Sequence, residues 1–444
     1  MRHVLVAVAS LCLASTAVSN AESDSAQLYW PQWRGPLATG VSPSADPPIE
    51  WDESKNIAWK VEVPGKGSAS PIVWDQTVFV LSAVPVGDPI EPEAQPDTSQ
   101  GRRGSRGLQP TRVQQFTIIA FHREDGRVLW SRVLRQQLPH EGTHTTGTWA
   151  SPSPMTDGER VYAFFGSFGL YCLDMEGNLL WEKDLGEMQT RLAFGEGSSP
   201  YLYEDKLVVN WDHEGPSFIV VLDKRTGKEI WRRDRDEITS WATPLVVDYA
   251  GQRQAIINAT GRVRSYDLDT GELIWEVAGM TVNVIPSPVF SDGIVYVASG
   301  FRGNALLAIR LAGARGDITG SDHIVWSLDH DTPYTPSPLL YGGNLYFLKT
   351  NNGILSAYNA RTGEKNFGPI RLEKVPNIYA SPVGAANRVY IAGRDGGTMV
   401  IANGPVFKVL AVNELDDGFD ASPALVDREI YMRGKRYLYR ISEN

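Results

Sequence analysis

The amino-acid sequence predicts an all-β protein, an eight-bladed β-propeller built from four-stranded antiparallel blades. First, a Ser-Pro or Thr-Pro pair followed by apolar residues recurs eight times, and from residue 153 onward at intervals of roughly 41–50 residues. Second, most repeats carry a turn glycine four residues before an aromatic residue. Third, each repeat has room for four short strands, which is typical of propeller blades. The eight pairs begin at Ser70, Ser153, Ser199, Thr243, Ser287, Ser337, Ser381 and Ser422.

The strands of one repeat follow from its residues in order. The proline opens the first strand, where its missing N–H costs little. A turn such as Asp157-Gly158 leads to a second strand, as at residues 160–162, and a variable loop leads to a third, as at residues 263–266. The fourth strand contains an aromatic residue. We expect that residue to pack between neighbouring sheets and to fix their register.

The turn before the fourth strand carries the sharpest pattern, because glycine permits the positive φ of a tight turn. The glycines Gly126, Gly177, Gly227, Gly271 and Gly363 stand four residues before Trp130, Trp181, Trp231, Trp275 and Phe367. Trp326 and Phe407 retain the aromatic residue without the glycine. The sequence therefore predicts degenerate turns in blades 5 and 7.

The last repeat, residues 422–441, ends after its third strand. Residues 56–61 have the length of a strand and contain Trp59, so we expect them to supply the missing fourth strand by pairing with residues 437–441. Such pairing closes the ring and removes its exposed edges. A two-domain β-sandwich would also contain short strands, but sandwiches do not repeat one pattern eight times.

The chain before the propeller divides into two parts. Residues 1–21 have the polar start, short apolar stretch and small residues of a signal peptide, which predicts export to the periplasm or beyond the cell. Lipid anchoring through Cys12 is less favoured because bulky Leu11 precedes it. Residues 22–49 are expected to be irregular and to dock on the propeller, which spans residues 50–444 as one domain.

Charge and composition limit the partners. The chain has 42 Lys and Arg against 52 Asp and Glu, and a net charge of −10 argues against binding nucleic acid or anionic membranes. An insertion at residues 84–113, rich in proline and charge, is expected to be mobile, either as a partner-binding arm or as a dispensable loop. Cys172 lies in an apolar run and is expected to be buried and unreactive.

Candidate functional residues fall on one face of the predicted propeller. Strands alternate in direction, so the strand 2–3 loops and the connections between blades share a face, and loops on a rigid scaffold commonly carry sites. The arginines there either hold an anionic ligand at the mouth of the central channel or pair with acids of the same loops. The candidates for this face are Arg191, Glu196, Trp241, Arg302, Arg394 and Asp395.

A metal site is a second hypothesis for the same face. His140, His144 and His213 lie in loops of adjacent blades, and Asp212 is next to His213. Imidazole and carboxylate groups bind zinc, manganese and other divalent ions. The alternative is a hydrogen-bonded network that supports long loops.

The repeat, in the form Thr270-Gly271-Glu272 to Trp275, resembles the PQQ-like repeat. That family contains the eight-bladed quinoprotein alcohol dehydrogenases and the outer-membrane assembly factor BamB. The resemblance covers about residues 50–441, and residues 30–36 also resemble the start of exported PQQ-like propellers. Quinoprotein dehydrogenases typically carry a vicinal cysteine pair. Only Cys172 follows the signal peptide, which argues against a bound PQQ cofactor.

The resemblance implies two functions. The first is a non-catalytic binding or assembly scaffold in the cell envelope with a protein partner. The alternative is a protein that binds a small ligand, or an oxidoreductase that uses a metal or a quinone on the loop face. We expect no nucleic-acid partner and no transmembrane segment.

Overall fold

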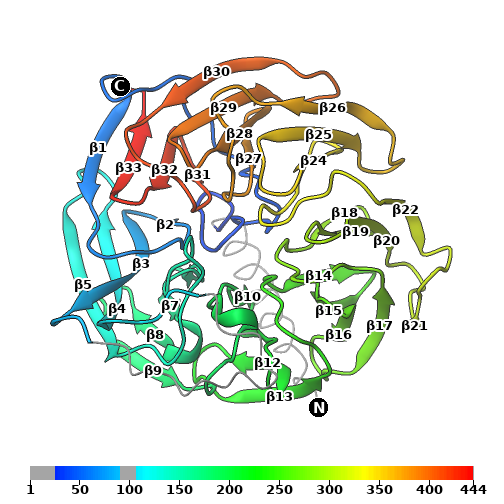
Figure 1. The fold of residues 1–444 in the computed structure, drawn as a ribbon, viewed down its shortest axis with the longest axis horizontal. Helices are drawn as coiled ribbons and strands as arrows, with labels where there is room; N and C mark the ends of the chain where they lie inside the picture. Colours follow the sequence, from blue (N-terminus) through cyan, green and yellow to red (C-terminus); the bar gives the residue numbers. More distant parts are fainter. Residues whose placement is uncertain (1–25, 91–106, 444) are drawn as a thin grey trace, which may run out of the picture.

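The computed structural model describes residues 26–90 and 107–443. Eight antiparallel sheets follow one another around a ring, as Figure 1 shows. Seven sheets have four strands, and the sheet of blade 4 has a fifth. The predicted fold class is confirmed: the chain is an eight-bladed β-propeller.

Blades 1 to 7 take their strands in sequence order, and blade 8 adds β1 to the last three strands. Blades 1 and 2 contain β2 (Ile72–Trp74), β3 (Thr77–Val86), β4 (Val113–His122) and β5 (Val128–Gln137), then β6 (Met155–Thr156), β7 (Arg160–Phe164), β8 (Leu170–Asp174) and β9 (Leu179–Lys183). Blades 3 and 4 contain β10 (Tyr201–Tyr203), β11 (Lys206–Trp211), β12 (Ser217–Asp223) and β13 (Glu229–Arg235), then β14 (Leu245–Tyr249), β15 (Gln252–Ile257), β16 (Arg262–Asp267) and β17 (Leu273–Ala278). Blades 5 and 6 contain β18 (Val289–Ser291), β19 (Ile294–Ser299), β20 (Ala305–Arg310) and β22 (Ile324–Leu328), then β23 (Leu339–Tyr341), β24 (Asn344–Leu348), β25 (Ile354–Asn359) and β26 (Lys365–Arg371). Blades 7 and 8 contain β27 (Val383–Ala385), β28 (Arg388–Ala392), β29 (Gly397–Ala402) and β30 (Val409–Glu414), then β31 (Ala424–Val426), β32 (Glu429–Arg433), β33 (Tyr437–Ser442) and β1 (Ile57–Glu62).

The ring is closed by pairing the first strand with the last. β1 runs antiparallel to β33, with Lys60 opposite Tyr439 and Val61 opposite Leu438. Figure 1 shows the two strands, blue and red, side by side in blade 8. The Lys60 ammonium lies 4.5 Å from the centre of the Tyr437 ring, which adds a cation–π contact across the closure. The predicted closing strand is confirmed.

Tryptophans of the fourth strands join neighbouring blades at five positions. The Trp181 ring of blade 2 covers Gly227 of blade 3, where a Cβ would lie 2.7 Å from the ring and φ is +68°. The Trp181 indole also donates a hydrogen bond to the Lys224 carbonyl in the same turn. Each tryptophan therefore packs on the turn glycine of the following blade. The five pairs are Trp59–Gly126, Trp130–Gly177, Trp181–Gly227, Trp231–Gly271 and Trp326–Gly363.

Blades 5 and 7 depart from this pattern, and each does so differently. In blade 5 the strand 3–4 connection carries β21 (Gly316–Asp317), which pairs in parallel with β17 of blade 4. In blade 7 the sequence pattern places Phe407 in the fourth strand. Phe407 instead precedes β30 and packs against Phe367 of blade 6, with ring centres 5.5 Å apart. Phe407 thus occupies the turn position that glycine holds elsewhere.

The Ser-Pro and Thr-Pro residues form a closed ring of hydrogen bonds. The Ser70 N–H donates to the Ser153 hydroxyl of the next blade, and each following repeat does the same until the Ser422 N–H donates back to Ser70. All eight N···O distances lie between 2.9 and 3.0 Å. The repeated hydroxyl therefore links the innermost strands of all blades.

The segment before β1 crosses the middle of the ring, where Figure 1 shows it in blue. Trp30 pairs with Val73 of blade 1, and the Pro31 carbonyl accepts the N–H of Thr156 in blade 2. The Gln32 side chain accepts the N–H of Leu202 in blade 3. Trp30 is 1% exposed, so this segment belongs to the core of the molecule.

Several predictions concern residues that the structure does not describe. The signal peptide, Cys12 and residues 91–106 of the insertion lie outside the described residues, so export, anchoring and mobility stay predictions. β3 and β4 extend into the predicted insertion and pair Val86 with Val113. Among the described residues, no helix has the length and apolar character needed to cross a bilayer.

Candidate binding pocket on the propeller axis

A cavity of about 470 Å³ lies at the axis of the propeller. Residues from most blades contribute to it, together with Trp33 from the segment before β1. We call the ring of eight hydrogen-bonded Ser and Thr residues, together with Trp33, the floor of the pocket. We call the other aromatic residues that line the cavity, apart from His144, the aromatic wall. The aromatic wall consists of Phe194, Trp241, Phe301, Tyr334 and Tyr379.

The floor is rich in hydrogen-bond donors. Seven of the eight ring hydroxyls line the pocket, and Ser287 is the exception. Each hydroxyl oxygen already accepts a backbone N–H, but no described residue accepts the hydroxyl proton of any of the eight. A serine or threonine hydroxyl both donates and accepts, so these protons are available to a bound molecule.

Arg34 carries a buried positive charge directly behind the floor, although it does not itself line the cavity. Its guanidinium donates to the carbonyls of Pro338 and Pro382, which directly follow two ring serines, and lies 5.9 Å from the Trp33 ring. The side chain is 3% exposed, and its Nε has no partner among the described residues. Burial lowers the pKa of Arg34 to about 9, so the residue still carries its charge at neutral pH.

The aromatic wall is held by contacts among its own rings and with polar neighbours. The rings of Phe301 and Tyr334 stack with centres 4.8 Å apart. The Arg394 guanidinium lies 3.8 Å from the centre of the Tyr379 ring. The Trp241 indole donates to the Gly195 carbonyl at 2.7 Å, which fixes the ring at the pocket. The wall therefore offers rigid, flat apolar surfaces to a ligand.

Glu196 borders the pocket as a buried carboxyl group. It accepts hydrogen bonds from the Ser167 N–H and hydroxyl. Burial raises the pKa of Glu196 to about 8, with a smaller contribution from the Glu141 charge. At pH 7 most of this group is therefore protonated and neutral.

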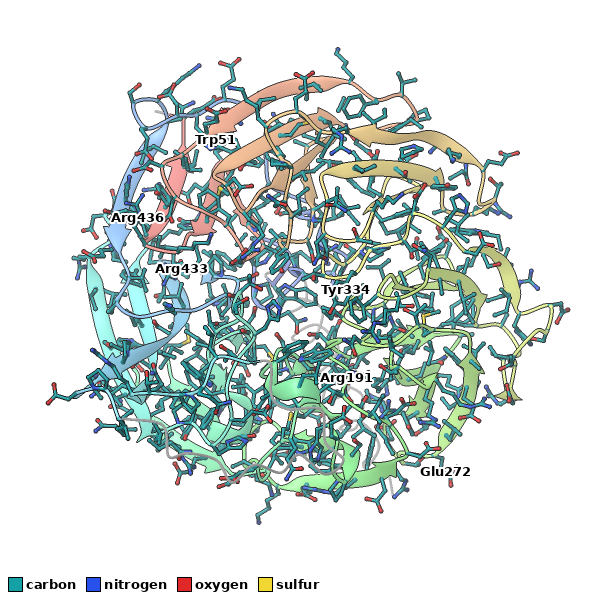
Figure 2. The ribbon with its side chains drawn as sticks, viewed as in Figure 1. Trp51, Arg191, Glu272, Tyr334, Arg433 and Arg436 are labelled. Carbon is teal, nitrogen blue, oxygen red and sulfur yellow. The ribbon has the colours of Figure 1, made fainter. Side chains whose placement is uncertain are left out.

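The predicted ligand-face residues divide between the pocket and its surroundings. Glu196 and Trp241 line the cavity. Arg394 reaches it through Asp420, with which it forms an ion pair, and through the Tyr379 ring. Figure 2 places Arg191 near Tyr334 at the middle of the ring.

The other candidates do not border the pocket. Arg302 lies over the Phe301 ring at 5.4 Å, and Asp395 accepts a hydrogen bond from Asn377. Neither is among the residues that line the cavity. Arg262 pairs with Glu276 and Asp317. The alternative that arginines of this face pair with nearby acids thus describes Arg394, which pairs with Asp420, and Arg262 behaves in the same way.

The four candidate metal ligands are each engaged elsewhere. Asp212 forms a bidentate ion pair with Arg235, and both side chains are fully buried. His213 uses both ring nitrogens, with the Gln189 N–H and the Pro216 carbonyl. His140 bonds to the Met188 carbonyl, and His144 bonds to the Thr146 hydroxyl at 2.7 Å.

The histidines therefore act as loop supports in this geometry. Burial lowers the pKa of both His144 and His213, which favours the neutral ring. Within residues 26–90 and 107–443, no group of three or more His, Cys, Asp and Glu side chains is arranged to hold a metal ion. The structure does not bring His140, His144, Asp212 and His213 together as a centre.

Cys172 lies apart from the pocket, in the core between blades 2 and 3. Its neighbours there include Tyr162 and Leu207. Burial raises the pKa of its thiol to about 12, so the thiol stays protonated and unreactive at neutral pH.

A second, larger hollow of about 1150 Å³ lies between blades 5 and 6. Its apolar lining includes Tyr249, Phe290 and Tyr341. Arg310 and Arg361 also border it, and neither forms an ion pair with a described residue. We call this hollow the blade 5–6 groove.

Sequence reasoning misses the floor of the axial pocket. The Ser-Pro repeat predicts strand starts through its proline, and the hydroxyl receives no role in that prediction. The eightfold recurrence of a hydroxyl residue at one position is the pattern that could have predicted a ring. The sequence predicts that Trp33 docks, but not that it lines a cavity beside Arg34.

Comparison with known proteins decides the family. A family model described as outer membrane protein assembly factor BamB matches residues 45–209 and 216–444. The chain belongs to this family. A curated BamB from Francisella salina is 30% identical over 80 residues, which are 18% of this chain and 14% of that protein. The match thus spans about a seventh of the curated relative.

Solved structures agree on the fold. BamB from Moraxella catarrhalis superposes with a TM-score of 0.55 at 14% identity, over 87% of this chain and 97% of that one. The quinohemoprotein alcohol dehydrogenase of Comamonas testosteroni superposes with a TM-score of 0.62 at 12% identity, over 97% and 84%. At 14% and 12% identity, both likenesses show that the chain shares the propeller fold with these two proteins.

The quinohemoprotein alcohol dehydrogenase among these neighbours returns attention to the hypothesis of a metal or a quinone on the loop face. Such a metal would need free ligand groups at the pocket. Glu196 is bonded to Ser167 and Asp420 to Arg394, so neither carboxyl group is free. The residues at the pocket therefore do not fit a metal ion.

Proposed function

We propose that this BamB family protein is an exported, non-catalytic binding scaffold that assembles components of the cell envelope. The observation that carries the proposal is the BamB family match across nearly the whole ring. The closed ring supports it, because a circular array of blades linked by hydroxyls and tryptophans presents loops in fixed positions. Export is supported by the sequence of residues 1–21.

The blade 5–6 groove is the surface we assign to a protein partner. The groove has an aromatic lining, and its two cations, Arg310 and Arg361, outnumber its one acid, Asp292. This lining fits a peptide segment that carries both apolar and acidic side chains. The strand 3–4 connection of blade 5, which carries β21, contributes Ala312 to the lining of this groove. A scaffold function therefore predicts that charge reversal at Arg361 weakens partner binding.

Crosslinking and affinity capture from envelope extracts test the scaffold. We expect Arg361→Glu to lower recovery of the specific partner at least tenfold. Arg225 holds the same turn position in blade 3 as Arg361 does in blade 6, so Arg225→Glu is the matched control and should leave recovery unchanged. Equal recovery with both variants would exclude the groove, and repeated capture without any specific partner would contradict the scaffold.

A second candidate function, binding of a small ligand, is favoured by the axial pocket. A cavity of about 470 Å³ with rigid rings and convergent polar groups has the size and lining of small-molecule sites. A ring compound such as benzoate or benzamide should occupy it and raise the melting temperature. Failure of both compounds would remove this candidate. An oxidoreductase that uses a metal is less supported, because the pocket offers no free ligand set.

A further inference from the structure

We propose that the floor of the axial pocket binds the carboxylate group of an organic anion, whose flat apolar body lies against the aromatic wall. This inference rests on the second candidate function and names its ligand class. Three features carry it: the hydroxyl donors of the ring, the buried charge of Arg34, and the absence of a competing free negative charge at the pocket.

The hydroxyl ring supplies the donors. Seven buried hydroxyls line the pocket, and none has an acceptor among the described residues. A carboxylate offers two oxygens with about four lone-pair positions, so it can accept several of these hydrogen bonds at once. Hydrogen bonds to an ionised acceptor are also stronger than those to a neutral one. A carboxylate therefore gains more from this floor than a hydroxyl or an amide does.

Arg34 supplies the positive charge. It lies beside the carbonyls of Pro338 and Pro382, one residue from ring serines, and no described carboxylate pairs with it. A buried charge without a counter-ion is costly, and an anion in the pocket would offset that cost. Gly40 allows the close packing of this side chain, since a Cβ there would lie 2.5 Å from the guanidinium. The chain thus holds an unpaired cation directly behind the floor, against Trp33.

The acids at the pocket do not oppose an anion strongly. Asp420 is paired with Arg394, which compensates its charge. Glu196 is held by Ser167 in a buried site where its neutral form dominates at pH 7. The remaining lining is aromatic or uncharged apart from His144, whose ring bonds to Thr146. The lining therefore carries no unpaired negative charge, and the unpaired charge nearest to the floor is the Arg34 guanidinium behind it.

Titration of the purified protein at pH 7 with benzoate and with benzamide tests the ligand class. The two compounds have the same ring, so only the charge of the head group differs. We expect benzoate to bind at least tenfold more tightly. Equal affinities would overturn the carboxylate inference and leave the small-ligand function standing. Binding of neither compound would overturn both.

Two variants test whether the charge of Arg34 causes the preference for benzoate over benzamide. Arg34→Met removes the charge and should bring the affinity for benzoate down to that for benzamide. Arg433 of β32 is the matched control, since it is also buried and forms no ion pair with a described residue. Neither arginine lines the cavity, but Arg34 lies directly behind the lining, against Trp33 and the carbonyls that follow two ring serines. Arg433→Met should keep the preference for benzoate. A preference for benzoate that persisted in Arg34→Met would contradict the role of Arg34.

A direct localisation does not depend on either variant folding. Crystals of the native protein soaked in bromide should show anomalous density between the ring hydroxyls and Trp33. Bromide bound only at surface sites, with the floor empty, would overturn the inference.

Discussion

Glu196 illustrates how much one side chain depends on its surroundings. Its carboxyl group is buried at the pocket, yet it faces the Ser167 N–H and hydroxyl, which favour the charged form. Burial and the nearby charge of Glu141 favour the neutral form, and burial has the larger effect. The pKa of Glu196 is therefore raised because the loss of hydration on burial outweighs the hydrogen bonds from Ser167.

The pKa of Glu196 makes stability depend on pH. Because its pKa is raised when the protein is folded, the native state binds more protons than the unfolded state between about pH 4.5 and 8. The stabilisation by the neutral carboxyl is complete below pH 4.5 and is lost as pH rises towards 8. The free energy of unfolding should fall by about 1.4 kcal/mol per pH unit from this group.

Denaturant unfolding across pH 5 to 8 checks this with Glu196→Gln, which removes the titration. The free energy of unfolding of the native protein should fall by a few kcal/mol relative to that of the variant as pH rises. Glu176→Gln, at an exposed carboxylate in a turn, is the control and should run parallel to the native protein. Parallel curves for Glu196→Gln as well would show that the group titrates normally.

At the level of single residues, the sequence predicts on which face of the propeller a residue lies better than it predicts which side chain that residue contacts. Glu196 and Trp241 can be assigned to the loop face from strand alternation alone. The pairing of Asp212 with Arg235 cannot, because the two residues are 23 positions apart and meet only when β11 and β13 pair with opposite edges of β12. For the same reason three histidines in neighbouring loops indicate a metal, although each ring has its own hydrogen-bond partner.

At the level of elements, the contact between a tryptophan and the next blade's turn holds neighbouring sheets together. Trp181 combines apolar packing on Gly227 with a hydrogen bond to the Lys224 carbonyl. The Trp181 ring packs directly on this turn, where the Cβ of any residue other than glycine would clash with it. Removing the ring leaves a void and an unpaired carbonyl.

Truncation of this ring measures its contribution. Trp181→Ala should lower the free energy of unfolding by about 3–5 kcal/mol, as core truncations of large aromatic residues do. Leu180 precedes it on β9 and is 49% exposed, so Leu180→Ala should change the free energy by less than about 0.5 kcal/mol. Chemical denaturation distinguishes the two. Similar values for both variants would contradict the role of the interblade contact.

The elements of the regular blades can be predicted because glycine, proline and tryptophan recur at fixed spacings. The elements of blades 5 and 7 cannot be predicted in this way, because where the repeat pattern fails they pack against residues of a neighbouring blade. β21 joins the sheet of blade 4 although it lies in the connection of blade 5. The residue type of Phe407 matches a strand position, yet the ring fills a turn against Phe367.

At the level of the whole molecule, stability depends on closure. β1 completes blade 8, and Trp59 of β1 packs on Gly126 of blade 1 and donates to the Arg123 carbonyl. One strand thus joins the last blade to the first. The sequence predicts this closure because the final repeat is one strand short.

Deletion of residues 50–62 tests closure. Without β1, the edge of β33 is exposed and blade 8 loses its contact with blade 1, so cooperative unfolding at the native melting temperature should disappear. Lys55→Ala, in the same segment but exposed, should leave the melting temperature within about 1 °C of the native value. Differential scanning calorimetry provides the measurement. An unchanged transition in the deletion protein would show that β1 is dispensable.

The position of β1 also constrains biosynthesis. β1 precedes every other strand of the ring in the chain, and its partner β33 follows all of them. A nascent chain therefore keeps β1 without its partner until the whole ring has been synthesised. Truncated translation products should then be recognised by chaperones and proteases, because each would display the unpaired strand and the uncovered Trp59.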